Sequence, residues 1–120
     1  MTESIAGKLA PYGIDWADAV DRFDGNTDLY KRMALKYEGD EHLVSLVAAM
    51  DVKDYDEAYK QAHALKGVAG NLSFAKLYEV AAVVSDALKA GEPEAAAERM
   101  GALEAAHEKV LEGLEVLRGA

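Results

Sequence analysis

Apolar residues recur at spacings of three and four along most of the chain, which is the spacing of one face of an α-helix. Candidate N-caps and glycine stops divide this pattern into seven predicted helices. They run from Ser4 to Ala10, from the cap Asp15 to the stop at Gly25, from the cap Asn26 to Gly39, from the cap Asp40 through Met50, from about Asp54 to Asn71, from the cap Ser73 to Gly91, and from Pro93 to about Leu117.

Long amphipathic helices joined by short loops form antiparallel neighbours. Long runs of β-branched and aromatic residues, which would indicate strands, are missing. The sequence therefore predicts an all-α fold, an antiparallel up-down four-helix bundle with additional short N-terminal helices. A chain of 120 residues has the length of one domain. We expect a single domain over residues 1–120, with residues 1–12 as an N-terminal extension and residues 13–118 as the helical bundle.

The charge balance and the absence of cysteine exclude several classes of function. The chain has 22 acidic and 13 basic residues, a formal net charge of −9, and no cluster of four or more Lys or Arg. A protein that binds the nucleic-acid backbone needs such a basic patch. Without cysteine, disulfides and thiolate sites are impossible. The first ten residues lack the apolar stretch of a signal peptide, and no apolar run approaches the roughly 18 residues of a membrane span. We expect a cytoplasmic protein that binds neither nucleic acid nor membranes.

The fifth predicted helix carries His63 on the face opposite its apolar residues. At about 100° per residue, Leu65 and Ala69 fall roughly 200–240° around the helix from His63. His63 is therefore expected to face solvent or a surface groove. Gly67 and Gly70 fall within about 40° of His63, on the same face.

The residues around His63 suit phosphoryl chemistry. A glycine inside a helix costs roughly 1 kcal/mol relative to alanine, and a surface position offers no packing reason for that cost. Missing side chains do clear space around the imidazole for another macromolecule. Tyr59, Lys60 and Lys66 lie within about 60° of His63, and Lys66, one turn away, can balance an added anion. An exposed imidazole is mostly neutral at pH 7, so its unprotonated nitrogen can attack phosphorus. On these features alone, an ordinary surface histidine remains the alternative.

The segment 63–72, His-Ala-Leu-Lys-Gly-Val-Ala-Gly-Asn-Leu, resembles the signature of histidine-containing phosphotransfer (HPt) domains. Their pattern is His-x-Leu-Lys-Gly, then small residues, then Asn-Leu-Gly. The resemblance extends over residues 13–117 and includes Asp15, Phe23, Asp54, Ala58, Leu77, Leu88 and Gly91. Ser73 stands where the family usually has glycine; because serine is a good N-cap, we expect the turn to survive.

The resemblance implies a function as well as a fold. HPt domains are antiparallel four-helix bundles with the histidine exposed near the middle of one helix. They accept a phosphoryl group from an aspartyl-phosphate on a response-regulator receiver domain and pass it to the aspartate of another receiver. They are not enzymes, because they bind no ATP and do not phosphorylate themselves. The Mg²⁺ ion belongs to the receiver, so no cofactor of the chain's own is expected. The implied partners are receiver domains and a hybrid sensor histidine kinase, which the chain would meet as a monomer.

The resemblance also implies roles for individual residues. His63 is implied as the phosphorylated residue. In some members a polar side chain on the following helix orients the imidazole, and that position here is Ser85. The other implied site residues are Lys66, which would support the phosphate, and Tyr59, Lys60, Gly67 and Gly70, which would give the receiver access and a docking surface.

The other two histidines have structural interpretations. Glu104 and His107 have the Glu-x-x-His spacing of a di-iron ligand pair, but such a site needs two pairs and two further glutamates, and only one pair occurs. We therefore interpret His107 as a partly buried structural residue and His42 as a surface residue at the start of a short helix. Neither a nucleophile-elbow motif nor a phosphate-loop motif is present.

A second class of function stays open, a non-phosphorylated helical adaptor that keeps the bundle and docks a receiver or kinase partner. An adaptor of this kind would bind its partner after the change His63→Gln and would carry no phosphate there. The intact His63, Lys66 and Gly67 favour the phosphate carrier, since an adaptor has no need of them.

Overall fold

The computed structural model describes residues 4–120, and in that range the chain is all-α without a strand, which confirms the predicted fold class. The α-helices are α1 (Ile5–Leu9), α2 (Trp16–Arg22), α3 (Thr27–Leu35), α4 (His42–Asp51), α5 (Tyr55–Asn71), α6 (Ala75–Lys89) and α7 (Pro93–Arg118), with 3-10 turns at Ala10–Tyr12 and Lys36–Gly39. Residues 1–3 of the predicted N-terminal extension lie outside the described residues. In this range no helix is long and apolar enough to cross a membrane.

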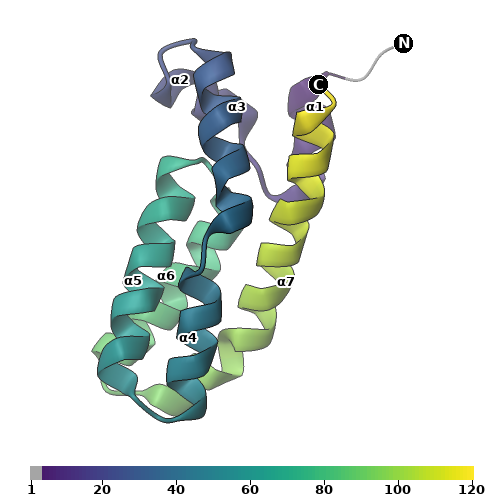
Figure 1. Ribbon diagram of the computed structural model, residues 1–120. Helices are drawn as coiled ribbons and strands as arrows, with labels where there is room; N and C mark the ends of the chain where they lie inside the picture. The colour runs from purple at the N-terminus through teal and green to yellow at the C-terminus, as the bar shows by residue number, and fades with distance from the viewer. Residues whose placement is uncertain (1–3) are drawn as a thin grey trace.

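The four helices α4 to α7 form the bundle. The loops between them cover only residues 52–54, 72–74 and 90–92. Loops this short reverse the chain direction, so successive helices run antiparallel. Figure 1 shows this up-and-down arrangement, with α1, α2 and α3 at the end of the bundle where α7 finishes.

Four of the helix starts follow from side-chain capping, and at the first of them, that of α1, Oγ of Ser4 accepts from the Gly7 N–H at 3.1 Å. The Oδ1 atoms of Asp15, Asn26 and Asp54 accept hydrogen bonds from the backbone N–H three residues on, at 3.0, 3.0 and 3.2 Å. Each bond satisfies one of the N–H groups that the first turn of a helix leaves without a partner. These caps set where α1, α2, α3 and α5 begin.

The prediction that Asp40 caps the fourth helix is wrong by one residue. The N-cap of α4 is Glu41, which makes no side-chain capping bond. The Asp40 carboxylate instead accepts hydrogen bonds from the backbone N–H and from Nδ1 of His42, both at 2.9 Å. Asp40 thus bonds to a backbone N–H of the first turn although it lies one residue before the N-cap.

The prediction that Ser73 caps the sixth helix is also wrong, because Ser73 belongs to the end of α5. Its φ of 59° lies in the left-handed region. The Phe74 N–H donates to the Ala69 carbonyl at 2.9 Å and the Ser73 N–H to the Gly70 carbonyl at 3.3 Å. This pair of bonds is the Schellman arrangement, in which the first residue past the helix adopts positive φ and is usually glycine. Phe74 is then the N-cap of α6.

One apolar core fills the interior of the bundle. Every bundle helix places an apolar stripe there, as expected for amphipathic helices. Fully buried members are Leu46 of α4, Leu65 of α5, Leu77 and Val84 of α6, and Leu103, Val110 and Leu114 of α7.

The N-terminal elements attach to the bundle through buried residues. Leu9 is completely buried and Ile14 nearly so. Ile14 approaches α7 so closely that a Cβ on Gly113 would lie 2.7 Å from its Cδ1 atom. The Tyr30 hydroxyl of α3 donates to the Leu72 carbonyl at 2.7 Å, and burial raises the pKa of Tyr30 well above its usual range. α1 and the segment containing Ile14 are therefore held on α7, and α3 on the turn that follows α5.

Candidate functional site

The structure places His63 on the outer face of α5, near its middle. Its neighbours Ala62 and Leu65 are completely buried, whereas His63 is exposed. The prediction that the core side of this helix lies opposite His63 is confirmed. Within residues 4–120, no side chain forms a hydrogen bond with the His63 ring.

Tyr59 borders the imidazole from the preceding turn of α5. The two ring centroids are 5.7 Å apart and the planes are inclined by 31°. Tyr59 is half-buried and packs in part against the core, while Lys60 beside it is exposed. The structure thus brings Tyr59 to His63 as the helical spacing predicts.

The two glycines differ in what surrounds them. A Cβ placed on Gly67 meets nothing within 4 Å, so no internal packing requires glycine there. A Cβ on Gly70 would come within 3.2 Å of Cδ2 and 3.3 Å of Cε2 of Tyr78. The sequence-based view that neither glycine has a packing reason is therefore wrong for Gly70, which makes room for the Tyr78 ring.

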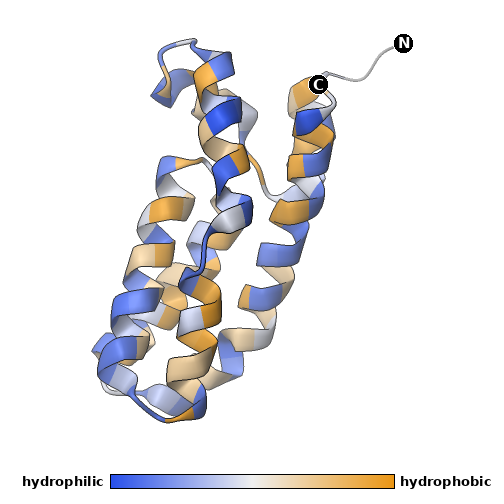
Figure 2. Cartoon of the chain, in the orientation of Figure 1, coloured by the Kyte–Doolittle hydropathy of each residue, from blue (hydrophilic) through white to orange (hydrophobic). Residues whose placement is uncertain are grey.

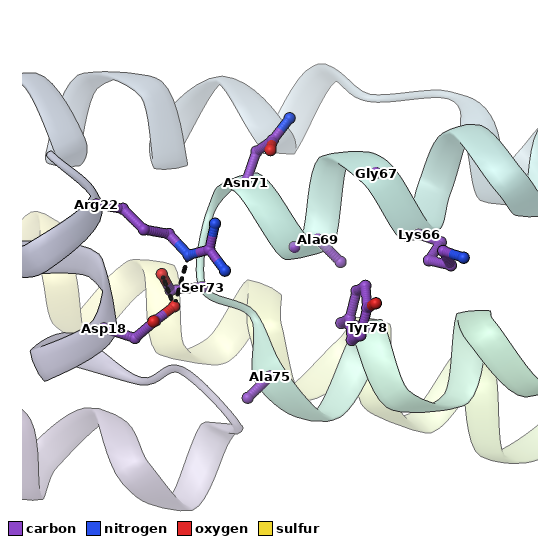
Figure 3. A pocket seen from close by; sticks show the side chains of 10 residues that line it. Asp18, Arg22, Lys66, Gly67, Ala69, Asn71, Ser73, Ala75 and Tyr78 are labelled. Carbon is purple, nitrogen blue, oxygen red and sulfur yellow. Dashed lines mark hydrogen bonds and ion pairs between the residues drawn. The ribbon is translucent and has the colours of Figure 1, made fainter.

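A cavity of about 450 Å³ opens beside Gly67 and Gly70. Figure 3 shows Lys66 and Tyr78 at one end of it and the Asp18–Arg22 pair of α2 at the other. The lining residues are Asp18, Arg22, Lys66, Gly67, Ala69, Gly70, Asn71, Ser73, Ala75 and Tyr78. Lys66 is half-buried and, among residues 4–120, has no ion-pair partner, so its positive charge is available at this surface.

A small polar network closes the far end of this cavity. The Asp18 Oδ2 atom accepts hydrogen bonds from Nε of Arg22 at 2.7 Å and from Oγ of Ser73 at 2.8 Å. These bonds, first that from Arg22 and then that from Ser73, hold the pKa of the Asp18 carboxyl below its usual value. They also tie α2 to the turn that follows the His63 helix.

The family model of the Hpt domain matches residues 34–113, two thirds of the chain, and His63 lies inside the matched range. The chain belongs to the Hpt domain family. The match covers α4, α5 and α6 and most of α7, whereas Asp18 and Arg22 lie outside it. Curated proteins and solved structures gave no match to this Hpt chain.

Ser85, the residue predicted to orient the imidazole, lies at the level of His63 in the Hpt bundle. Gly70 faces Tyr78, and because α5 and α6 are antiparallel, moving seven residues back along α5 and seven forward along α6 brings His63 level with Ser85. The Ser85 side chain is 2% exposed, and none of the hydrogen bonds found in residues 4–120 joins it to His63. Its role in orienting the ring stays a prediction.

The remaining two histidines have the surroundings of structural residues. His107 is half-buried, and its Nδ1 lies 2.7 Å from the hydroxyl of Tyr37, which agrees with the structural interpretation. His42 is paired with Asp40 at the start of α4. Within residues 4–120, no group of three or more His, Cys, Asp or Glu is placed to hold a metal ion.

Arg22, Asp18 and Tyr78 are the residues of this surface that sequence reasoning missed. The i, i+4 spacing of Asp18 and Arg22 did signal an ion pair within α2. Nothing in the local sequence signalled its contact with Ser73, which is 55 residues further along the chain.

We expect Ser73→Ala to lower the free energy of unfolding by about 1–2 kcal/mol, because alanine keeps the left-handed strain and loses the hydrogen bond to Asp18. Ser73→Gly loses the same bond but relieves the strain, so it should be the more stable of the two variants by about 1 kcal/mol. Urea denaturation of the three proteins measures both differences. An alanine variant as stable as the glycine variant would show that positive φ is not a cost at this position.

Proposed function

We propose that the protein is a phosphoryl carrier of a two-component phosphorelay, with His63 as the phosphorylated residue. It would accept the group from an aspartyl-phosphate of a receiver domain and pass it to the aspartate of another receiver. The observation that carries the proposal is the exposure of His63, within the Hpt match, beside open space at Gly67. Hpt domains interact with receiver domains and kinases in phosphorelays and act as carriers without catalytic activity of their own.

The chemistry needs only an accessible imidazole. An unprotonated ring nitrogen of His63 attacks phosphorus, an N–P bond forms, the P–O bond to the receiver's aspartate breaks, and the aspartate leaves as a carboxylate. The reverse sequence delivers the group to the next receiver. Mg²⁺ on the receiver stabilises the charge on the phosphoryl oxygens. No ATP site, no autokinase step and no cofactor of the chain's own enters this scheme.

Docking would use the outer face of α5. Gly67 leaves the receiver room to approach in line with the ring nitrogen, and Gly70 makes room for the Tyr78 ring beside that path. Tyr59 and Lys60 would contact the receiver from the preceding turn.

We further propose that the chain works as a cytoplasmic monomer and one domain, with residues 13–118 as the bundle and 1–12 as an extension. We also propose that its donor is a hybrid sensor histidine kinase.

The experiment that tests this function is phosphoryl transfer from a receiver domain carrying labelled aspartyl-phosphate, with Mg²⁺ present. Label that appears on the protein, is lost in acid and survives alkali identifies phosphohistidine. ATP alone should give no label. A receiver that binds the protein without giving up its phosphate would instead favour the adaptor.

Lys66→Ala is expected to slow phosphoryl transfer by about tenfold without stopping it. Lys66 offsets the charge of the incoming group, while the receiver's metal ion supplies most of the compensation, so a loss of about 1.4 kcal/mol of transition-state stabilisation is the expected scale. Rapid-quench transfer kinetics measure the rate. The control is Lys109→Ala, an exposed lysine of α7 outside the cavity, which should transfer at the normal rate. Complete loss of transfer with Lys66→Ala would contradict this supporting role.

A further inference from the structure

A groove runs between α4 and α7, apart from the surface around His63. Two cavities of about 480 and 370 Å³ lie along it, and they share Val47 and Glu104 in their linings. Figure 1 shows these two helices bordering the face turned toward the viewer. The α7 side of the groove extends from Ala97 to Glu108, which at 1.5 Å per residue is about 17 Å, or three turns of a helix.

The outer face of α4 is apolar, which is unusual for a helix at a surface. Its inward residues Leu43, Leu46 and Ala49 are buried, as a bundle requires. On the other side Val44 is 70% exposed, and Val47 is only half-buried. Figure 2 shows apolar colour over most of α4, whereas α5 beside it has both blue and orange turns. A surface helix normally presents polar residues outward, so this face has the composition of one that is covered.

The charged residues of the groove are mainly acidic. Asp51, Glu104 and Glu108 line it, Lys53 is the one lysine or arginine among the lining residues, and His107 lines one of the two cavities. A second copy of the chain would bring the same carboxylates and a net charge of −9 against them. Like charges that face one another oppose association, whereas basic residues are attracted. The charge therefore favours a basic partner over self-association.

We propose that the α4–α7 groove binds a basic amphipathic helix, about three turns long, of a partner protein. Apolar residues at positions i, i+3 or i+4, and i+7 of that helix would contact Val44, Val47 and Met100. Lys and Arg on its flanks would pair with Glu104 and Glu108. His63 does not line the groove, so this partner would bind without covering the residue proposed to carry phosphate.

The test uses the full chain and two fluorescent synthetic peptides of 14 residues, one an amphipathic Leu/Lys helix and the other its Leu/Glu counterpart. Anisotropy titrations compare the wild type with Val44→Lys and Val52→Lys. Val52 is a matched control, because it is also a valine, is 74% exposed and lies outside both cavities. Both changes add one positive charge, so only the place of the charge differs.

We expect the Leu/Lys peptide to bind the wild type and the Val52→Lys variant within about twofold of each other, and Val44→Lys at least about tenfold more weakly, a difference of about 1.4 kcal/mol. The double change Glu104→Gln and Glu108→Gln should weaken binding and flatten its salt dependence, while His63→Gln should leave binding unchanged. Equal binding of the Leu/Lys peptide by both valine variants would mean adsorption to an acidic surface and would overturn the proposal. A preference of the wild type for the Leu/Glu peptide, or no binding of the Leu/Lys peptide, would overturn it as well. Self-association of the wild type in sedimentation that is lost with Val44→Lys would show that a second copy covers the groove, which also overturns it.

Discussion

His63→Gln is expected to abolish phosphate uptake completely while leaving the fold and its stability unchanged. Glutamine has no ring nitrogen that can form an N–P bond, so no partial activity is expected. The side chain of residue 63 is exposed and makes no hydrogen bond within residues 4–120, so its replacement changes only the surface contact with the Tyr59 ring and leaves no buried polar group without a partner. Surface substitutions of this kind change stability by less than about 0.5 kcal/mol.

The measurement is labelled-phosphate uptake from a phosphorylated receiver in the presence of Mg²⁺, with a thermal melt of each protein alongside it. The matched control is His42→Gln, which removes a histidine that is paired with Asp40 at the start of another helix. This control should take up phosphate at the wild-type level. Label on His63→Gln would place the acceptor elsewhere, and a melting temperature several degrees below that of the wild type would show that residue 63 contributes to the fold.

The exposure of His63 follows from sequence periodicity because a helix repeats its faces on a local scale. Once Leu65 and Ala69 define the buried side, the direction of every other residue of α5 is fixed by the 100° rotation per residue. The structure agrees, with Leu65 and Ala69 completely buried and His63 exposed. The starts of α2 and α3 are predictable for a similar reason, since an N-cap bonds to a backbone N–H only three residues away.

The same local reasoning fails at Ser73, where two rules compete. Serine before a helix suggests an N-cap, but the preceding helix ends in a turn that needs positive φ at this residue. The glycine that HPt domains usually have here was the available signal. What stabilises serine in its place is the bond to Asp18 on a distant helix, and tertiary contacts of that kind are not encoded in any local pattern.

Packing between helices is the other feature that cannot be predicted from the periodicity of the sequence. Gly70 looks like a second access glycine until α6 is placed against α5 and the Tyr78 ring is found over it. The groove beside α4 likewise depends on where α7 lies, because Val44 would be an ordinary core residue if α7 covered it. Both features arise from how helices pack side by side, which periodicity within one helix cannot specify.

Gly67→Gln is expected to raise the stability of the protein and yet slow phosphoryl transfer by about tenfold or more. Glutamine is the better helix former, so α5 should gain about 0.5 kcal/mol, and the empty space at residue 67 accepts the side chain without a clash. The same side chain then occupies the path one turn from His63 that a receiver would need. Urea denaturation gives the stability, and titration with a receiver domain followed by transfer kinetics separates weaker docking from slower chemistry.

Gly101→Gln is the matched control for the higher stability and the slower phosphoryl transfer expected of Gly67→Gln. Gly101 is an exposed glycine inside α7, and a Cβ there also meets nothing within 4 Å. The change should stabilise the protein by a similar amount and leave transfer untouched. A variant that is more stable but transfers more slowly cannot owe its defect to misfolding. If Gly67→Gln raises the free energy of unfolding and lowers the transfer rate, while Gly101→Gln transfers normally, the defect is assigned to blocked access. Equal transfer by both variants would mean that the open space beside His63 is not the path of the receiver, and the function of Gly67 would have to lie elsewhere.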